Sequence, residues 1–268
     1  MSIVYGPVAS WRLGRSLGID LTPSDVKTCS FDCIYCQLGR TVRLVVERAQ
    51  FVSLQALAAE MEAVRGIAAD YVTFSGMGEP TLAANLGEAI RLARRMLGLP
   101  VAVLTNSSLM TRKDVREDLA CADVVVAKLD APNQQLLERI NRPVTALSFQ
   151  DVVDAIRLFK TEHRGKLALQ MMFVRANKGL AAEMAALARR LAPDEVQINT
   201  PLRPSPVAPL TREEMATVLV HFKGVPVVAV YEAWRPAVTP LSVGETLRRR
   251  PAASLTRRRA IGPERGTR

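Results

Sequence analysis

Three cysteines lie within eight residues, at Cys29, Cys33 and Cys36, in the spacing C-x3-C-x2-C. In a reducing compartment, clustered thiols bind metals or act in catalysis more often than they form disulfides. Thiolates are the usual ligands of iron–sulfur clusters, and a cubane has four irons to satisfy. Three protein ligands leave one iron open to another ligand. The spacing therefore predicts a [4Fe–4S] cluster with an open coordination position.

Structural zinc is the alternative for this motif, and it requires a fourth ligand. The chain has only two histidines, His163 and His221, and each falls in a segment of helical pattern. The fourth cysteine, Cys121, lies in the apolar stretch Leu-Ala-Cys-Ala. Free cysteine in such a setting behaves as a small hydrophobic residue. We therefore expect Cys121 to be buried and to bind no metal.

The chain has 268 residues, of which 49% are hydrophobic and 23% charged. This composition is typical of a globular protein, and the length suits one large domain. No apolar run is long enough to span a bilayer, and the N-terminus lacks the features of a signal peptide. We expect a cytoplasmic protein with no membrane partner. The net charge of +10 is concentrated in residues 247–268, which carry eight arginines against one acid. This segment predicts a disordered basic tail, either a solvated end or an arm that contacts nucleic-acid phosphates.

Short β-branched runs alternate along the chain with longer segments of helical period. The predicted strands fall near residues 17–21, 71–75, 101–104, 123–129, 167–174 and 195–199. The predicted helices include residues 54–65, 84–97, 134–140, 149–160 and 180–191. Repeated β–α units with apolar strands indicate an α/β fold with a parallel sheet covered by helices. Six units fit an open partial barrel or a doubly wound sheet.

In both architectures the active site lies at the carboxyl ends of the strands. Polar residues do follow the predicted strands, so we expect them to gather at one rim. They are the cysteines after the first strand, Gly78 and Glu79 after the second, Thr105 and Asn106 after the third, Asp130 after the fourth, Arg175 and Asn177 after the fifth, and Asn199 after the sixth. Residues 1–210 then form the core domain. Residues 211–246 are predicted to form a short C-terminal extension that covers the open side of the barrel.

The motif C-x3-C-x-aromatic-C, with Tyr35 as the aromatic residue, resembles the signature of the radical S-adenosylmethionine (SAM) superfamily. The fold of that family is a partial (β/α)6 barrel. Its glycine–glutamate motif after the second strand resembles Gly78-Glu79-Pro80, although Met77 replaces the first glycine of the usual pair. The resemblance implies that SAM chelates the open iron while this loop receives the SAM amino group. A glycine allows close backbone approach, and a carboxylate pairs with an ammonium group.

The same resemblance implies further cofactor contacts. Tyr35 would lie near the adenine, and Asn199 would contact it. Thr105, Asn106 and Asp130 would contact the methionine or ribose moieties. Helix capping or turn formation is the alternative role for each of these polar residues.

More narrowly, the chain resembles the radical SAM group related to wyosine-type tRNA base synthases. The similar segments are residues 5–8, 13–20, 27–33, 74–82 and 199–204. The tRNA-modifying relatives carry additional cysteines for a second cluster. Here only Cys121 is left over, so the chain cannot build that cluster. A shared fold with a different substrate is compatible with this departure.

These patterns predict an enzyme that takes one electron from a flavodoxin- or ferredoxin-like donor. Reductive cleavage of SAM would yield methionine and a 5′-deoxyadenosyl radical that abstracts hydrogen from an unidentified substrate, with a tRNA base as one candidate. A peptide or protein substrate, as in glycyl-radical activation, is the first alternative. A non-catalytic metal module that binds RNA through its tail is the second. The motif at Gly78-Glu79 and the polar rim favour an enzyme, because a binding module needs no SAM pocket.

Overall fold

The computed structural model of the protein describes residues 1–252. Its centre is an eight-stranded sheet in the order β1-β2-β5-β6-β7-β8-β9-β10. All neighbouring strands from β2 to β10 are parallel, and β1 pairs antiparallel with β2. The strands span, in that order, Val4–Ser10, Gly14–Ile19, Tyr71–Phe74, Val101–Thr105, Val124–Lys128, Lys166–Met172, Glu195–Asn199 and Val227–Ala229.

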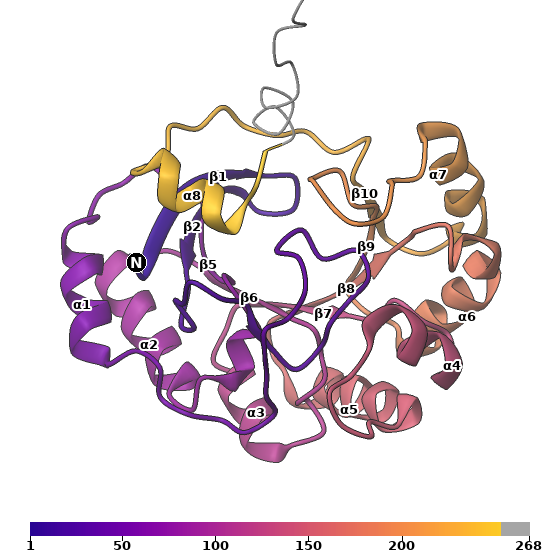
Figure 1. Ribbon diagram of the computed structural model, residues 1–268, viewed down its shortest axis with the longest axis horizontal. Helices are drawn as coiled ribbons and strands as arrows, with labels where there is room; N and C mark the ends of the chain where they lie inside the picture. The colour runs from indigo at the N-terminus through magenta and orange to yellow at the C-terminus, as the bar shows by residue number, and fades with distance from the viewer. Residues whose placement is uncertain (253–268) are drawn as a thin grey trace, which may run out of the picture.

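Helices connect the strands and lie on the outer side of the sheet, which curls into a half-barrel (Figure 1). The α-helices are α1 (Leu54–Glu62), α2 (Leu86–Leu97), α3 (Lys113–Leu119), α4 (Gln134–Leu136), α5 (Phe149–Glu162), α6 (Ala181–Leu191), α7 (Arg212–Leu219) and α8 (Val243–Arg249). The remaining turns are the 3-10 helices η1 (Pro80–Leu82), η3 (Lys178–Leu180) and η4 (Val220–Phe222) and the π-helix η2 (Leu137–Asn141). The predicted α/β partial barrel is confirmed.

The core lies between the helices and the outer face of the sheet. Residues such as Val72, Val103 and Leu169 on the strands and Ala89 and Met184 on the helices have no exposed surface. Burial of apolar surface on this scale is the main stabilising contribution to a β/α domain. It also holds the carboxyl ends of the strands in fixed positions, which makes that rim a rigid platform.

Two edges of the sheet differ from the sequence prediction. The first strand was expected near residues 17–21, but β2 begins at Gly14 and a hairpin partner, β1, precedes it. The sequence of β1 contains Gly6 and Pro7, which weaken a strand pattern, and the pairing register shifts between Tyr5 and Val8. Proline is tolerated there because β1 is the edge strand. At the other edge, β10 pairs with β9 and adds an eighth strand to the sheet.

The C-terminal part of the described chain returns from β10 to the opposite edge, where α8 packs against β1 (Figure 1). The basic tail was predicted to begin at residue 247. That boundary is wrong, because α8 continues to Arg249 and the Arg249 side chain is fully buried. The rest of the predicted tail, residues 253–268, lies outside the described residues. Within residues 1–252, the helices are too short and too polar for any of them to cross a bilayer.

Candidate active site

The three cysteines lie on a loop that begins at the short strand β3 (Thr28–Cys29), which pairs with β4 (Arg43–Leu44). The backbone of the π-helix η2 and the residues after it hold this loop in place. Asp32 N donates to Arg142 O at 3.1 Å, and Ile34 N donates to Ile140 O at 2.9 Å. The loop is therefore fixed over the open interior of the half-barrel.

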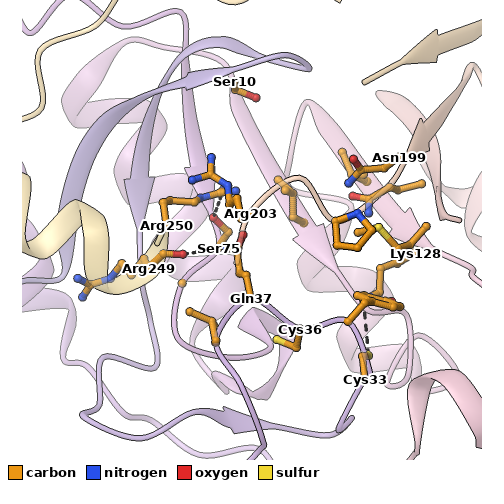
Figure 2. A pocket seen from close by; sticks show the side chains of 18 of the residues that line it. Ser10, Cys33, Cys36, Gln37, Ser75, Lys128, Asn199, Arg203, Arg249 and Arg250 are labelled. Carbon is orange, nitrogen blue, oxygen red and sulfur yellow. Dashed lines mark hydrogen bonds between the residues drawn. The ribbon is translucent and has the colours of Figure 1, made fainter. Parts of the chain in front are cut away.

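All three cysteines line one cavity of about 470 Å³ inside the barrel. Cys29 and Cys33 are buried, and Cys36 is partly exposed. Figure 2 shows Cys33 and Cys36 on the floor of this cavity, with Lys128 and Asn199 on one side. The loop thus presents three thiols to a single, partly enclosed space.

Nitrogen donors surround the buried sulfurs. Asn106 Nδ2 lies 3.5 Å from Cys29 Sγ. Asn141 Nδ2 lies 3.5 Å and Lys128 Nζ 3.8 Å from Cys33 Sγ. Hydrogen bonds of this kind stabilise thiolates and tune cluster potentials. Burial, and then the nearby Glu79 carboxylate, raise the pKa of the free Cys29 thiol to about 12; a bound metal would reverse that preference by taking the thiolate as its ligand.

This donor set fits a cubane cluster. The cavity wall offers three thiols, and its one carboxylate, Glu79, is bonded to protein groups; neither histidine lines it. His163 instead stacks on Phe159 at 4.8 Å, just after α5, and His221 lies in η4. Across residues 1–252 no three His, Cys, Asp or Glu side chains share the spacing of a single-ion site. Cubane ligands bind separate irons and have no need of that spacing.

The fourth cysteine lies away from this site. Cys121 is partly exposed, not buried as the sequence suggested, and its sulfur accepts a hydrogen bond from Arg91 Nη1 at 2.9 Å. The short turn after α3 leaves one side of Cys121 at the surface while the other contacts the core. It does not line the cavity.

The loop after β5 carries Gly78 and Glu79 into the cavity wall. A Cβ atom on Gly78 would lie 1.6 Å from the Thr28 carbonyl oxygen, so only glycine allows this loop to approach β3. Glu79 N donates to the same carbonyl at 3.2 Å. The glycine is thus required by contact with the cysteine-bearing strand, a reason that sequence alone did not suggest.

The Glu79 carboxylate is 2% exposed and connects two strand ends. It accepts hydrogen bonds from Thr105 Oγ1 and Asn106 N after β6, both at 2.7 Å, and from Thr81 Oγ1 at 2.7 Å. Burial raises its pKa above the ordinary value, although these donors act in the opposite direction. Glu79, Thr105 and Asn106 therefore form one bonded group on the cavity wall, as the predicted rim requires.

Tyr35 and Asp130 form a second bonded group. Tyr35 lines the cavity and donates its hydroxyl hydrogen bond to Asp130 Oδ2. Asp130 also accepts from Asn141 Nδ2 at 2.8 Å and from Met172 N at 2.9 Å. Asp130 itself does not line the cavity, in contrast to the contact expected from the family resemblance. A strand-end carboxylate can face the space or support its wall, and here it supports Tyr35.

Asn199, at the end of β9, lines the cavity as predicted. Its side-chain oxygen accepts from Thr200 N at 2.9 Å, which leaves the amide nitrogen available to a ligand. Asn177, by contrast, is 1% exposed and bridges Asp130 O and Met172 O, so it supports the rim without lining it. Arg175 also lies outside the cavity lining.

Sequence reasoning missed two residues beside Cys33. Lys128 lies at the end of β7 and stands 4.9 Å from the Tyr35 ring centroid. Burial opposes its charge, but Cys33 and Asp130 raise its pKa overall. A lysine inside an apolar strand was the available signal. Asn141 gave no signal, because the π-helix that aims it at Cys33 is not visible in the helical pattern; such π-turns occur often at functional sites.

Helix α8 supports the site from outside. Arg249 Nε donates to Asp20 Oδ2 at 2.9 Å, and the same oxygen accepts from Met77 N at 3.1 Å. The Arg249 carbonyl accepts from Gln37 Nε2 at 2.9 Å, one residue after Cys36. Arg249 is thus connected to the loop after β5 through Asp20 and bonded directly to the cysteine loop through Gln37.

The cavity is strongly cationic. Glu79 is its one lining carboxylate, against seven cations: Arg12, Lys27, Lys128, Arg203, Arg235, Arg249 and Arg250. Three cysteine thiolates cannot neutralise all seven of these cations, and the sulfonium group of SAM is itself positively charged.

Comparisons with known proteins identify the class. Residues 24–198 match the sequence profile of the Radical SAM superfamily. The chain belongs to this superfamily, whose enzymes use a [4Fe–4S] cluster and SAM. Family membership favours the enzymatic interpretation over the non-catalytic module.

Two relatives in sequence place the chain more narrowly within the superfamily. The chain is 40% identical to the UPF0026 protein slr1464 of Synechocystis over 76% of this chain and 77% of that one. It is 36% identical to the UPF0026 protein MJ1312 of Methanocaldococcus jannaschii, over 76% of this chain and 65% of that one. The chain therefore belongs with the UPF0026 proteins.

Solved structures show the same fold at low identity. Native anSMEcpe with bound AdoMet matches with a TM-score of 0.61 and 17% identity, over 81% of this chain and 64% of that chain. Streptococcus suis SuiB bound to S-adenosylmethionine matches with a TM-score of 0.58 and 13% identity, over 78% of this chain. The matched region is 50% of the SuiB chain.

Proposed function

We propose that Cys29, Cys33 and Cys36 hold a [4Fe–4S] cluster and that the adjoining cavity binds SAM and a substrate. The observation that carries this proposal is the shared cavity: the three thiols and Glu79 line one space at the carboxyl ends of the strands. When bound and reduced, the cluster supplies the electron that splits SAM into methionine and a 5′-deoxyadenosyl radical, which takes a hydrogen atom from the substrate.

The residues of this chain bind, orient and shield. Glu79, held by Thr105 and Asn106, provides a buried carboxylate suited to the SAM ammonium group. Tyr35, fixed by Asp130, offers an aromatic surface for the adenine, and Asn199 offers a free amide donor. The barrel would shield a bound cluster from water and would position the substrate beside SAM.

The electron would come from a flavodoxin- or ferredoxin-like protein of the cytoplasm. Cys36 is the partly exposed member of the motif, so we expect the donor to approach from its side of the cysteine loop. One electron would be needed for each SAM that is cleaved, and the resulting radical would form 5′-deoxyadenosine only by taking a hydrogen atom from the substrate or, without substrate, from another donor.

For the substrate, a tRNA base is the first candidate. The segments that resemble wyosine-type synthases and the excess of cavity cations support it. A peptide is the second candidate, because SuiB was solved bound to its precursor peptide SuiA and anSMEcpe with peptides. Those relationships lie below 20% identity and support the fold more than the substrate.

The test is anaerobic incubation of the reconstituted protein with SAM and dithionite, followed by quantification of 5′-deoxyadenosine. The proposal expects its formation with stoichiometric methionine. Absence of both products from a protein that retains its iron would contradict it. Identification of the RNA or protein that co-purifies then separates the two substrate candidates.

A further inference from the structure

We propose that Arg12, Arg203, Arg235 and Arg250 form a subsite for a phosphate group of the substrate. The inference rests on the proposed function and deepens it, because it assigns a chemical class to the substrate of the same cavity. The four arginines come from four separate segments: the β1–β2 turn, the loop after β9, the loop after β10 and the residues after α8. All four line the cavity.

The four guanidinium groups lie close enough to repel one another. The pKa of Arg12 is lowered to about 9, first by burial and then by the positive charges of Arg250, Arg203 and Arg235. The pKa of Arg203 is lowered to about 10, first by burial and then by the positive charges of Arg250 and Arg235. Figure 2 shows Arg203 and Arg250 side by side near Ser75. Like charges held together in a partly enclosed space are unfavourable unless an anion joins them.

No carboxylate of residues 1–252 forms an ion pair with any of these four arginines. The carboxylate of Glu195 acts on the charge of Arg12 only weakly, and it is already paired with Lys166 at 2.5 Å. Arg12 donates from Nη2 to Gln170 Oε1 at 2.8 Å, but its buried Nε has no hydrogen-bond partner within that part of the chain. A buried donor without an acceptor is a costly feature that a bound ligand would satisfy.

The other cavity cations are already matched. Lys128 lies beside Cys33 and Asp130, and the charge of Lys27 acts on Cys29. Arg249 pairs with Asp20 and Glu245. The cluster thiolates and the protein carboxylates therefore account for three cations and leave the four arginines without an anion.

A phosphate group would satisfy these four arginines better than the SAM carboxylate would. A carboxylate has two oxygens and one negative charge, which one bidentate guanidinium satisfies. A phosphate monoester has three free oxygens and up to two negative charges, and arginine forks match its geometry. Four guanidinium groups that line one cavity therefore indicate either one phosphate monoester or two neighbouring phosphodiesters of a nucleic-acid backbone, each of which carries one negative charge.

The test uses the anaerobically reconstituted protein with saturating SAM at constant ionic strength. Calorimetric titration measures the affinity of inorganic phosphate for the wild type, for the double variant Arg203→Gln/Arg235→Gln, and for Arg190→Gln. Arg190 is an exposed arginine of α6 outside the cavity, so this variant controls for the loss of an arginine charge away from the subsite. Each charged hydrogen bond lost weakens binding by about tenfold, so the double variant should bind phosphate about a hundredfold more weakly. Arg190→Gln should match the wild type.

Three results would overturn the proposal. Equal phosphate affinity in the double variant would do so. So would a loss of SAM affinity with phosphate binding intact, because the arginines would then serve the SAM carboxylate. A double variant that melts well below Arg190→Gln would show packed structural arginines, since removal of mutual repulsion should leave the melting temperature equal or higher.

Two further ligands distinguish the source of the phosphate. Adenosine 5′-monophosphate represents a small ester, and an RNA oligonucleotide without terminal phosphates represents a backbone. Whichever binds more weakly to the double variant than to the wild type identifies the source, and failure of both contradicts the proposal. Formation of 5′-deoxyadenosine by the wild type is recorded in parallel, so that failure of the SAM chemistry and failure of the phosphate subsite are separate outcomes.

Discussion

Replacement of Arg249 by methionine should destabilise the whole domain, although Arg249 lies in a run of arginines near the end of the described chain. Its guanidinium group is fully buried and donates to Asp20 Oδ2 and Glu245 Oε2, both at 2.9 Å. Asp20 is 1% exposed. Methionine fills much of the volume but leaves the Asp20 carboxylate without its counter-charge. Removal of one partner from a buried pair costs about 3–5 kcal/mol.

The cost should depend on pH. Burial raises the pKa of Asp20 above its ordinary value, while Arg249 draws it down. In Arg249→Met that pKa rises further. A raised carboxyl pKa gives stability below the unfolded value that is lost as the pH rises through the folded value. The destabilisation should therefore be larger at about pH 8 than at about pH 5, where Asp20 takes up a proton more readily.

Urea denaturation followed by circular dichroism measures these differences. Arg248→Met is the matched control, because Arg248 is exposed and pairs with the exposed Asp25 at 3.1 Å and with the partly buried Glu245 at 3.5 Å, but not with Asp20. It should cost no more than about 1 kcal/mol. The double variant Asp20→Asn/Arg249→Met should recover much of the lost stability. A double variant no more stable than Arg249→Met, or a cost that is the same at both pH values, would refute the buried-pair reasoning.

Three further experiments examine the site and the C-terminal segment. Glu79→Gln should weaken SAM binding by about tenfold through loss of a charged hydrogen bond, with iron content intact; unchanged affinity by equilibrium dialysis would reassign the loop to structure. Gly78→Ala should lower the melting temperature and iron content, since its Cβ would overlap Thr28 O, whereas Gly179→Ala has open space and should change neither. A chain that ends at residue 252 should keep its fold and iron, and one that ends at residue 246 should lose stability with Arg249. If residues 253–268 contact RNA, the shorter of the two deletions should also flatten the salt dependence of RNA binding by about one log–log unit per phosphate contact; an unchanged slope would indicate an idle end.

The repeated β–α pattern and the cysteine spacing were sufficient to predict the partial barrel and the position of the thiols. Strand ends also predicted which polar residues reach the rim, because parallel strands place their carboxyl ends together. The direction in which a side chain at a strand end points could not be predicted in the same way. Thr105 and Asn199 line the cavity, but Asp130 supports Tyr35 from behind it. Both orientations follow the same sequence pattern, and packing decides between them.

The predicted start of the C-terminal tail was wrong for a different reason. A run of arginines is usually a solvated segment, so residues 247–268 were predicted to form one tail. Arg249 is instead buried, and a sequence signal for its helix existed. Ser242 and Glu245 have the spacing of a helix start, and the Ser242 side chain accepts from Glu245 N at 3.3 Å. Asp20, the buried partner of Arg249, lies more than two hundred residues away in the sequence, which no local pattern reveals.

The most direct test of the account is the iron and sulfide content of protein purified without oxygen. The wild type should be brown, with about four irons and four sulfides per chain. Cys29→Ala, Cys33→Ala and Cys36→Ala should each lose nearly all of the iron, while Cys121→Ala should retain it. A colourless protein that contains zinc, or a Cys33→Ala variant with full iron content, would contradict the claim that these three thiols hold a [4Fe–4S] cluster.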